Sequence, residues 1–173
     1  MKSHRLLLCL ALLLLPLTGH AFSSGSGTCN ASLMAAAPMG AGTLGTGGYA
    51  ISMPNGPWTP GQSSVVRLSG PGVFKGLLMY ATNSSGTRVG SFAINNGYRS
   101  MPECSGSMPT GTFTHGSSIS KSVPVDFTWT APATDVGPIT VNAIVLLGFN
   151  SYFVFVSAPI SSGDRVFGNG FEP

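Results

Sequence analysis

One apolar run decides the fold of this chain: Val73-Phe74-Lys75-Gly76-Leu77-Leu78-Met79-Tyr80-Ala81. Turn-forming residues stand on both sides of it, Ser69-Gly70-Pro71-Gly72 before it and Asn83-Ser84-Ser85-Gly86 after it. Because the run is short and bounded, it cannot extend into a helix of useful length, and it predicts a buried central β-strand. Gly76 within the run predicts a place where a neighbouring chain or side chain packs closely.

Other short apolar segments follow at the regular spacing of an antiparallel sandwich. Val125, Phe127 and Trp129 alternate with polar residues, which predicts a strand with one buried face and one exposed face. No helical period appears, so the expected fold class is all-β. The predicted strands cover residues 49–53, 64–68, 73–81, 89–94, 123–129, 139–147 and 152–156.

The segment 139–160 is long and apolar enough to suggest a transmembrane helix. It contains two asparagines and a proline, and its β-branched and aromatic residues favour paired strands. We therefore expect a hairpin that joins residues 139–147 to residues 152–156 through a turn at 148–151. No transmembrane segment is expected in the mature protein.

The N-terminus has the features of a secretory signal peptide. Lys2 and Arg5 precede the apolar run Leu6–Leu17, and the small residues that end at Ala21 suit cleavage. A membrane anchor would need about 20 apolar residues, and this run is shorter. We therefore expect residues 1–21 to be removed on export. The mature protein is expected to be secreted or extracellular, with the periplasm or the cell surface as alternatives.

Removal of the leader changes the charge and the cysteine count. Six of the eight Lys and Arg residues remain against five Asp and Glu, and they are scattered, which argues against a nucleic-acid partner. Cys9 leaves with the leader, so Cys29 and Cys104 remain. Two cysteines in an exported domain suggest one disulfide, with two buried free thiols or intermolecular pairing as the alternatives.

An ordered set of motifs resembles the reeler (reelin) domain family over about residues 29–156. The resemblance implies an immunoglobulin-like antiparallel β-sandwich in which Cys29 is bridged to Cys104. It also implies an extracellular protein, since the family occurs in matrix and adhesion proteins and in small secreted defence proteins that bind microbial surface polymers. The motifs are Phe74-Lys75-Gly76-Leu77-Leu78-Met79-Tyr80-Ala81, Gly90-Ser91-Phe92, Cys104, Thr114-His115 and Phe127-Thr128-Trp129-Thr130-Ala131-Pro132.

The chain is expected to divide into four segments. These are the signal peptide 1–21, a flexible lead-in 22–28, the sandwich domain 29–160 and a C-terminal tail 161–173. The tail is similar to a short aromatic and glycine tail that ends many exported bacterial proteins, so a bacterial source and a sorting or display role are hypotheses. The alternative is a terminus whose phenylalanines rest on the sandwich.

Residues suited to catalysis are few. His115 is the histidine that remains after leader removal, and the carboxylates have no paired spacing that would tune an acid against a base. We therefore expect no enzymatic activity and no cofactor. The alternative is a periplasmic copper carrier that uses Met101, Met108 and His115, because thioether sulfur and imidazole suit copper. Methionine is, however, also a common filler of irregular cores.

The expected function is binding or adhesion through the loops at the ends of the sandwich or through an exposed sheet face. The expected partners are a polysaccharide, a lipopolysaccharide or a cell-surface protein. Two regions are the richest in candidates, the turn around Trp58 and the loop 95–111. His115 is expected to be a strand-end residue that hydrogen-bonds a neighbouring loop. The candidate residues are Trp58, Tyr98, Arg99 and His115.

Overall fold

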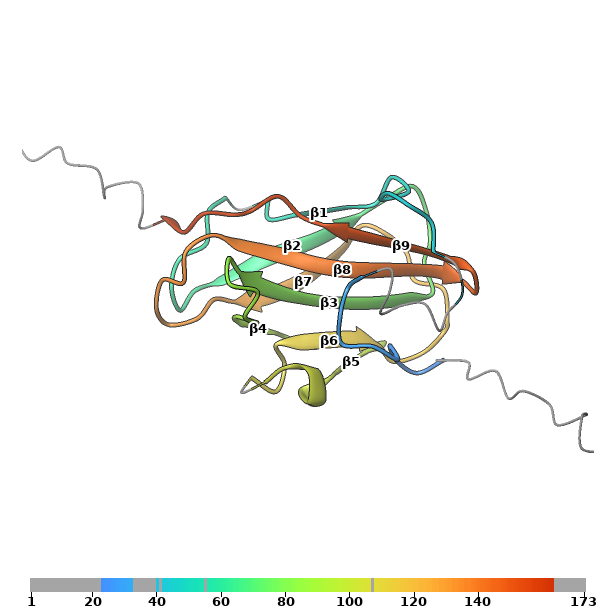
Figure 1. Cartoon of the computed structure of the whole chain (residues 1–173), viewed down its shortest axis with the longest axis horizontal. Helices are drawn as coiled ribbons and strands as arrows, with labels where there is room; N and C mark the ends of the chain where they lie inside the picture. The colour runs from blue at the N-terminus through green and yellow to red at the C-terminus, as the bar shows by residue number, and fades with distance from the viewer. Residues whose placement is uncertain (1–22, 33–39, 41, 55, 107, 164–173) are drawn as a thin grey trace, which may run out of the picture.

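Two antiparallel sheets pack face to face in the computed structural model, which describes residues 23–32, 40, 42–54, 56–106 and 108–163 (Figure 1). The all-β, immunoglobulin-like sandwich expected from the sequence is confirmed. The four-stranded sheet has the order β1 (Ala50–Ser52), β2 (Ser63–Ser69), β7 (Val125–Thr130) and β4 (Ser91–Phe92). The five-stranded sheet has the order β5 (Tyr98–Ser100), β6 (Thr112–His115), β3 (Gly76–Asn83), β8 (Ile139–Gly148) and β9 (Ser151–Val156).

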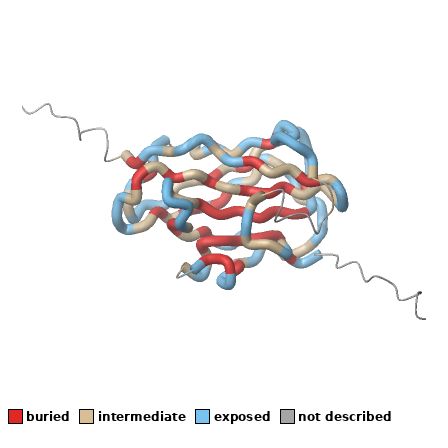
Figure 2. The backbone as a smooth tube through the Cα atoms, in the orientation of Figure 1, coloured by how far each residue is buried: buried red, intermediate tan, exposed pale blue. Residues whose placement is uncertain are grey.

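The run that opens the sequence analysis forms β3, the central strand of the five-stranded sheet. β3 pairs with β6 on one side and with β8 on the other, and its first six residues are all buried (Figure 2). The strand begins at Gly76 and not at Val73, which is 56% exposed in the connection from β2. The close approach expected at Gly76 is confirmed, because a Cβ there would lie 3.0 Å from Leu146 Cβ.

Aromatic side chains fill the space between the two sheets. The alternation predicted for β7 is confirmed, since Phe127 and Trp129 are buried while Asp126 and Thr128 are exposed. The ring of Phe127 lies 4.7 Å from that of Phe113 on the opposite sheet. The strand expected at 89–94 is reduced to β4, because the chain at Gly90 turns with a φ of 68° against the indole of Trp129.

A second buried cluster covers the outer face of the five-stranded sheet. It contains Leu78 and Tyr80 of β3, and it lies beneath the N-terminal segment, which crosses the sheet in blue in Figure 1. The Cys29–Cys104 disulfide fixes this segment, which confirms the implied pairing over free thiols. Closing a loop with a sequence separation of 75 stabilises the fold by about 4 kcal/mol in the chain-entropy model. β3 is therefore apolar along both faces because both are covered.

The N-terminal segment differs from the flexible lead-in expected at 22–28. Ser26 N–H donates to Thr114 Oγ1 at 2.8 Å, and Ala31 N–H donates to the Tyr80 hydroxyl at 3.0 Å. A serine- and glycine-rich composition suggested freedom, but these backbone groups find partners on the sheet. The described part of the segment is therefore docked on the domain.

The predicted hairpin at the C-terminal end of the domain is confirmed. β8 pairs with β9 through a tight turn in which Asn150 has a φ of 57°. Within the described residues, no helix has the length and apolar character needed to cross a lipid bilayer. The predicted signal peptide 1–21 and residues 164–173 of the predicted tail lie outside the described part of the chain.

Candidate functional site

Trp58 is a core residue, and the prediction that it lines a ligand-binding loop is wrong. Its side chain is 0% exposed and meets Trp129 edge-on, with ring centroids 6.1 Å apart. The turn is closed by the C-terminal end of the domain, because Gly163 N–H donates to the Trp58 carbonyl at 2.7 Å. An indole enclosed in this way cannot contact a ligand at the surface.

His115 is likewise enclosed, with 4% of its surface exposed. Its Nδ1 accepts a hydrogen bond from Leu77 N–H at 3.2 Å and lies 3.2 Å from Thr114 Oγ1. His115 is therefore a hydrogen-bonding residue at the end of β6, as expected, and Leu77, to which its Nδ1 bonds, belongs to β3, where a loop partner was expected. The imidazole is not placed to bind an external ligand.

Tyr98 and Arg99 lie on β5, because the expected loop 95–111 contains this strand and a short 3-10 turn, η3 (Pro102–Cys104). The half-buried ring of Tyr98 closes the edge of the core 5.1 Å from Phe127, and burial raises the pKa of Tyr98 to about 12. Arg99 is exposed, and its Nε donates to the Ser24 carbonyl at 2.6 Å. Both residues therefore serve the fold.

The structure separates the residues of the copper alternative. Met101 is 3% exposed in the outer cluster, and its N–H donates to the Thr112 carbonyl. His115 lies three residues after Thr112 on β6. At the rise of a β-strand, this places it about 10 Å from Thr112 along the strand. Met108 is part of a turn in which its carbonyl accepts from Gly111 N–H at 2.9 Å. Among the described residues, no three His, Cys, Asp or Glu side chains are grouped to hold a metal ion.

A different surface emerges where β8 ends and β9 begins. Loops from distant parts of the chain gather there, and we call this surface the loop end (Figure 1). Phe74 and Lys121 exchange two backbone hydrogen bonds of 3.0 and 2.7 Å, and Gly116 N–H donates to the Gly97 carbonyl at 2.8 Å. The Tyr49 hydroxyl donates to the Val73 carbonyl at 3.0 Å. The loops are residues 42–49, 70–75, 94–97, 116–124 and 148–151.

Exposed apolar side chains concentrate at the loop end. Among the described residues, six large hydrophobic side chains are exposed, and five of them lie on five separate loops of this surface. Figure 2 shows the loops at this end as mainly exposed backbone around a buried interior. Sequence reasoning did not identify these residues as an exposed set, although all but Val73 are single large apolar residues near glycines, serines or asparagines. They are Leu44 at 81%, Ile119 at 74%, Phe149 at 71%, Val73 at 56% and Ile94 at 37% exposure.

The loop end carries lysines and no described acidic residue. The Nζ of Lys121 donates to the carbonyls of Lys75, Ser117 and Ile119 at 3.1, 2.7 and 2.9 Å. Burial lowers the pKa of Lys121. Lys75 itself is exposed. Lys121 therefore organises the loop that carries Ile119.

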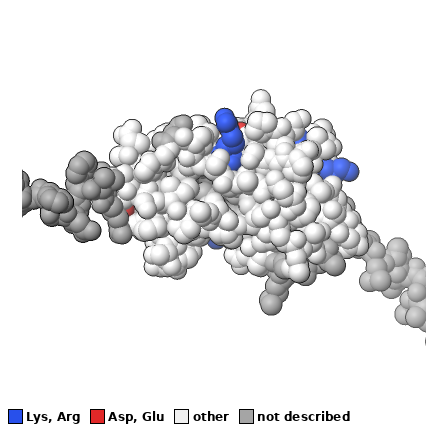
Figure 3. All heavy atoms as spheres, turned by 90° about the horizontal axis from the view of Figure 1, so that it is seen from above, with Lys and Arg blue, Asp and Glu red and all other residues white. Residues whose placement is uncertain are grey.

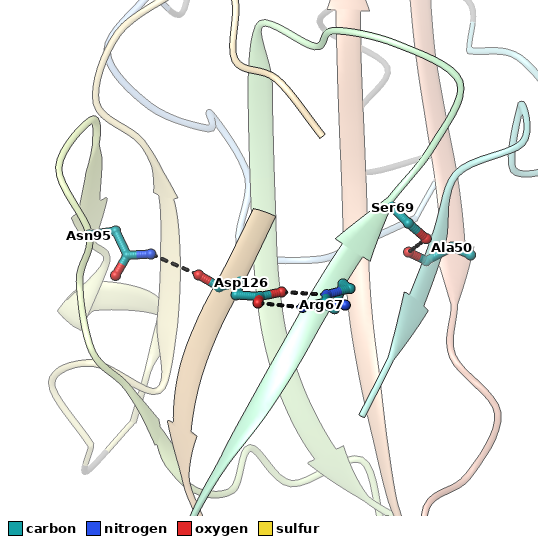
Figure 4. A network of polar contacts seen from close by, with 5 residues as sticks. All are labelled: Ala50, Arg67, Ser69, Asn95 and Asp126. Atoms are coloured by element: carbon teal, nitrogen blue, oxygen red, sulfur yellow. Dashed lines mark hydrogen bonds and ion pairs between the residues drawn. The ribbon is translucent and has the colours of Figure 1, made fainter. Parts of the chain in front are cut away.

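Charge is sparse elsewhere on the domain as well, and most of the face in Figure 3 is neutral. On the outer face of the four-stranded sheet, Arg67 binds both carboxylate oxygens of Asp126 at 2.7 Å (Figure 4). The hydrogen bonds from Arg67 lower the pKa of Asp126. Asn95 Nδ2 donates to the Asp126 carbonyl at 2.9 Å, which ties the loop 94–97 to this pair. The charges of Arg67 and Asp126 cancel each other, so this pair leaves no unpaired charge that would mark the face as a binding site in preference to the loop end.

Comparisons with known proteins agree with the architecture. The chain resembles the crystal structure of the human F-spondin reeler domain (fragment 1), with 17% identity, a TM-score of 0.58, and coverage of 72% of this chain and 95% of that one. A structure of the reelin-N domain of F-spondin matches with 17% identity, a TM-score of 0.59, and coverage of 74% and 95%. No curated protein matches the chain.

The family is established by the sequence itself. The model of the Reeler domain matches residues 28–164, which is more than half of the chain and includes the motifs that suggested the resemblance. Reeler domains are a non-enzymatic and generally extracellular type of domain. The chain belongs to the Reeler domain family.

Proposed function

We propose that this protein is a secreted, non-catalytic binding module that attaches to cell-surface or matrix material through the loop end. One observation carries the proposal: five of the six exposed large hydrophobic side chains in the described residues lie on this one surface. Isolated exposed hydrophobic residues are ordinary, but their concentration at one place is typical of an interaction site.

The proposed location outside the cell is supported by the domain type and by the disulfide. Bonds such as Cys29–Cys104 persist in oxidising compartments, where exported proteins reside. The predicted signal peptide agrees with this location. The bacterial source suggested by the tail is a separate hypothesis on which the binding proposal does not depend.

The nature of the loop end bears on the choice among the expected partners. Polysaccharide recognition commonly uses exposed aromatic rings beside polar groups, and Phe149 is the aromatic residue that the loop end exposes. Leu44 and Ile119, which the loop end also exposes, are aliphatic. The surface therefore suits lipopolysaccharide or an apolar patch on a cell-surface protein better than a plain polysaccharide.

A binding assay with matched variants tests the proposal. Protein expressed with its own leader is applied to isolated cell envelopes and to an array of glycans and lipopolysaccharides. A variant with Leu44→Ser, Ile119→Ser and Phe149→Ser is expected to bind about tenfold more weakly, because it removes most of the apolar contact. The control Val156→Ser alters an exposed apolar side chain, at 55%, that lies on β9 outside the loop end, and it is expected to bind normally. Equal binding by both variants would reject the loop end as the binding surface.

A further inference from the structure

The exposed apolar side chains of the loop end come from separate loops, one from each loop. Leu44, Val73 and Phe149 each adjoin a glycine, at positions 45, 72 and 148, where an added Cβ would meet nothing within 4 Å. The backbone beside each tip is therefore bordered by open space. A surface of separate projecting tips differs from the continuous, close-packed patch that most protein partners require.

From this shape we propose that the loop end inserts its apolar tips into the headgroup and acyl boundary of a lipid membrane. The inference rests on the proposed binding function and names the partner for it. A lipid surface is soft and can enclose each tip separately, whereas a folded partner would need a pocket for every one. Apolar side chains at a membrane interface gain the same burial that anchors interfacial helices.

Several backbone carbonyls of these loops already accept hydrogen bonds from within the protein. Groups that enter a lipid interface lose water, and unpaired ones are costly there. At the loop end, the carbonyls of Ser117 and Ile119 accept from Lys121 Nζ, and the carbonyls of Gly72 and Val73 accept from the Tyr49 hydroxyl. Internal hydrogen bonds thus reduce the cost of moving these loops out of water.

The charge distribution agrees with an anionic lipid surface. The described acidic residues, Glu103, Asp126 and Asp135, all lie outside the loops of the loop end, so no carboxylate on these loops opposes contact with phosphate headgroups. Lys75 is exposed at this end, next to Val73 and Phe74 in sequence. A lysine beside apolar tips can lay its alkyl chain along the interface and place its ammonium among the headgroups.

Flotation with protein-free vesicles tests the inference. The full protein is mixed with vesicles of phosphatidylcholine alone or with added phosphatidylglycerol, and bound protein is separated by density. Binding is expected to both, more strongly to the anionic vesicles. The Leu44→Ser, Ile119→Ser, Phe149→Ser variant is expected to bind about tenfold less, with Val156→Ser unchanged. Lys75→Gln is expected to weaken binding to anionic vesicles only.

A fluorescent reporter tests insertion directly. Trp58 and Trp129 are both 0% exposed, so their emission is expected to stay constant when vesicles are added. In a Phe149→Trp variant, the new indole is expected to shift to shorter wavelength and to be quenched by brominated acyl chains. All the changes are at exposed positions, so each variant is expected to fold normally. Thermal melting of each variant checks this.

The outcomes separate this inference from the proposed function. Envelope binding that depends on the loop end, together with no binding to pure vesicles, would overturn lipid insertion and leave the binding function standing. Vesicle binding that the triple variant retains would also overturn insertion by these tips. A dimer in sedimentation that the triple variant abolishes would instead assign the surface to a second copy of this chain. Loss of dependence on the loop end in both assays would overturn both proposals.

Discussion

Two turns, one at each end of the sandwich, place a large aromatic side chain in opposite ways. At one end, Trp58 lies in a turn rich in glycine and proline, and its side chain is 0% exposed. At the loop end, Phe149 lies in a turn next to glycine and asparagine, and its side chain is 71% exposed. Turn composition therefore does not decide whether a large residue in a turn belongs to the core or to the surface.

The chain that closes over each turn makes the difference. Trp58 N–H donates to the Ser161 carbonyl at 3.3 Å, and Gly163 N–H donates to the Trp58 carbonyl. The C-terminal segment of the domain therefore covers the turn that holds the indole. Beside Phe149, the backbone at Gly148 faces open space. The comparison teaches that a candidate binding residue in a loop has to be judged by what covers it.

The largest expected effect is the difference in unfolding free energy between substitutions in the two turns. Trp58→Ala is expected to lower the free energy of unfolding by about 3 to 5 kcal/mol, because it removes a fully buried aromatic ring. Phe149→Ala is expected to change it by about 0.5 kcal/mol or less, since the ring is exposed. Urea denaturation followed by far-UV circular dichroism measures both. Similar losses for the two variants would mean that the ends do not differ as described.

A smaller effect is expected within the loop end. Lys121→Met removes the donor to three loop carbonyls and is expected to lower the free energy of unfolding by about 1 to 2 kcal/mol. Lys75→Met serves as the matched control, because this lysine is exposed at the same end. Denaturation curves and amide hydrogen exchange of residues 116–121 measure the change. A loop that exchanges no faster in Lys121→Met would show that Lys121 does not organise it.

The smallest effect concerns pH and Tyr98. Its pKa is about 12 in the folded protein and about 10 when unfolded, so the folded state holds the proton more tightly. This contribution to stability is fully present below about pH 10 and is lost as the pH rises towards 12. Tyr98→Phe is expected to flatten the fall in stability over this range, measured by denaturation at several alkaline pH values. An unchanged pH profile in Tyr98→Phe would assign the fall to other groups.

Most of the architecture could be predicted from local pattern. The run at 73–81 identified the central strand because apolar residues on both faces are needed where both faces are covered. The alternation around Phe127 identified β7, since a sheet with one buried face repeats every two residues. Family motifs added the pairing of Cys29 with Cys104. The ends of the strands were less predictable, as Val73 and the short β4 show. Where a strand ends depends on where the chain turns to cross between the sheets.

The candidate site could not be predicted in the same way. Trp58 was chosen because it is a large aromatic residue in a turn. Its burial, however, involves a pairing with Ser162, which is about 100 residues later in the sequence. His115 was weighed as a ligand, yet its partner is the backbone of β3. The loops that carry Leu44 and Phe149 adjoin only through tertiary contacts, such as the hydrogen bond from Thr43 N–H to the Tyr152 carbonyl. Sequence shows which residues could serve a function, and the fold decides which of them reach the surface.

The disulfide also decides how the molecule would carry tension. If a surface-attached molecule were pulled through its N-terminus, the force would enter at Cys29 and pass through the covalent bond directly to Cys104. The strands from β1 to β5 lie within that closed loop and would carry no part of the load along the backbone. Stretching would then begin at β6 and the strands that follow it. The bond would therefore limit how far the chain can extend under load.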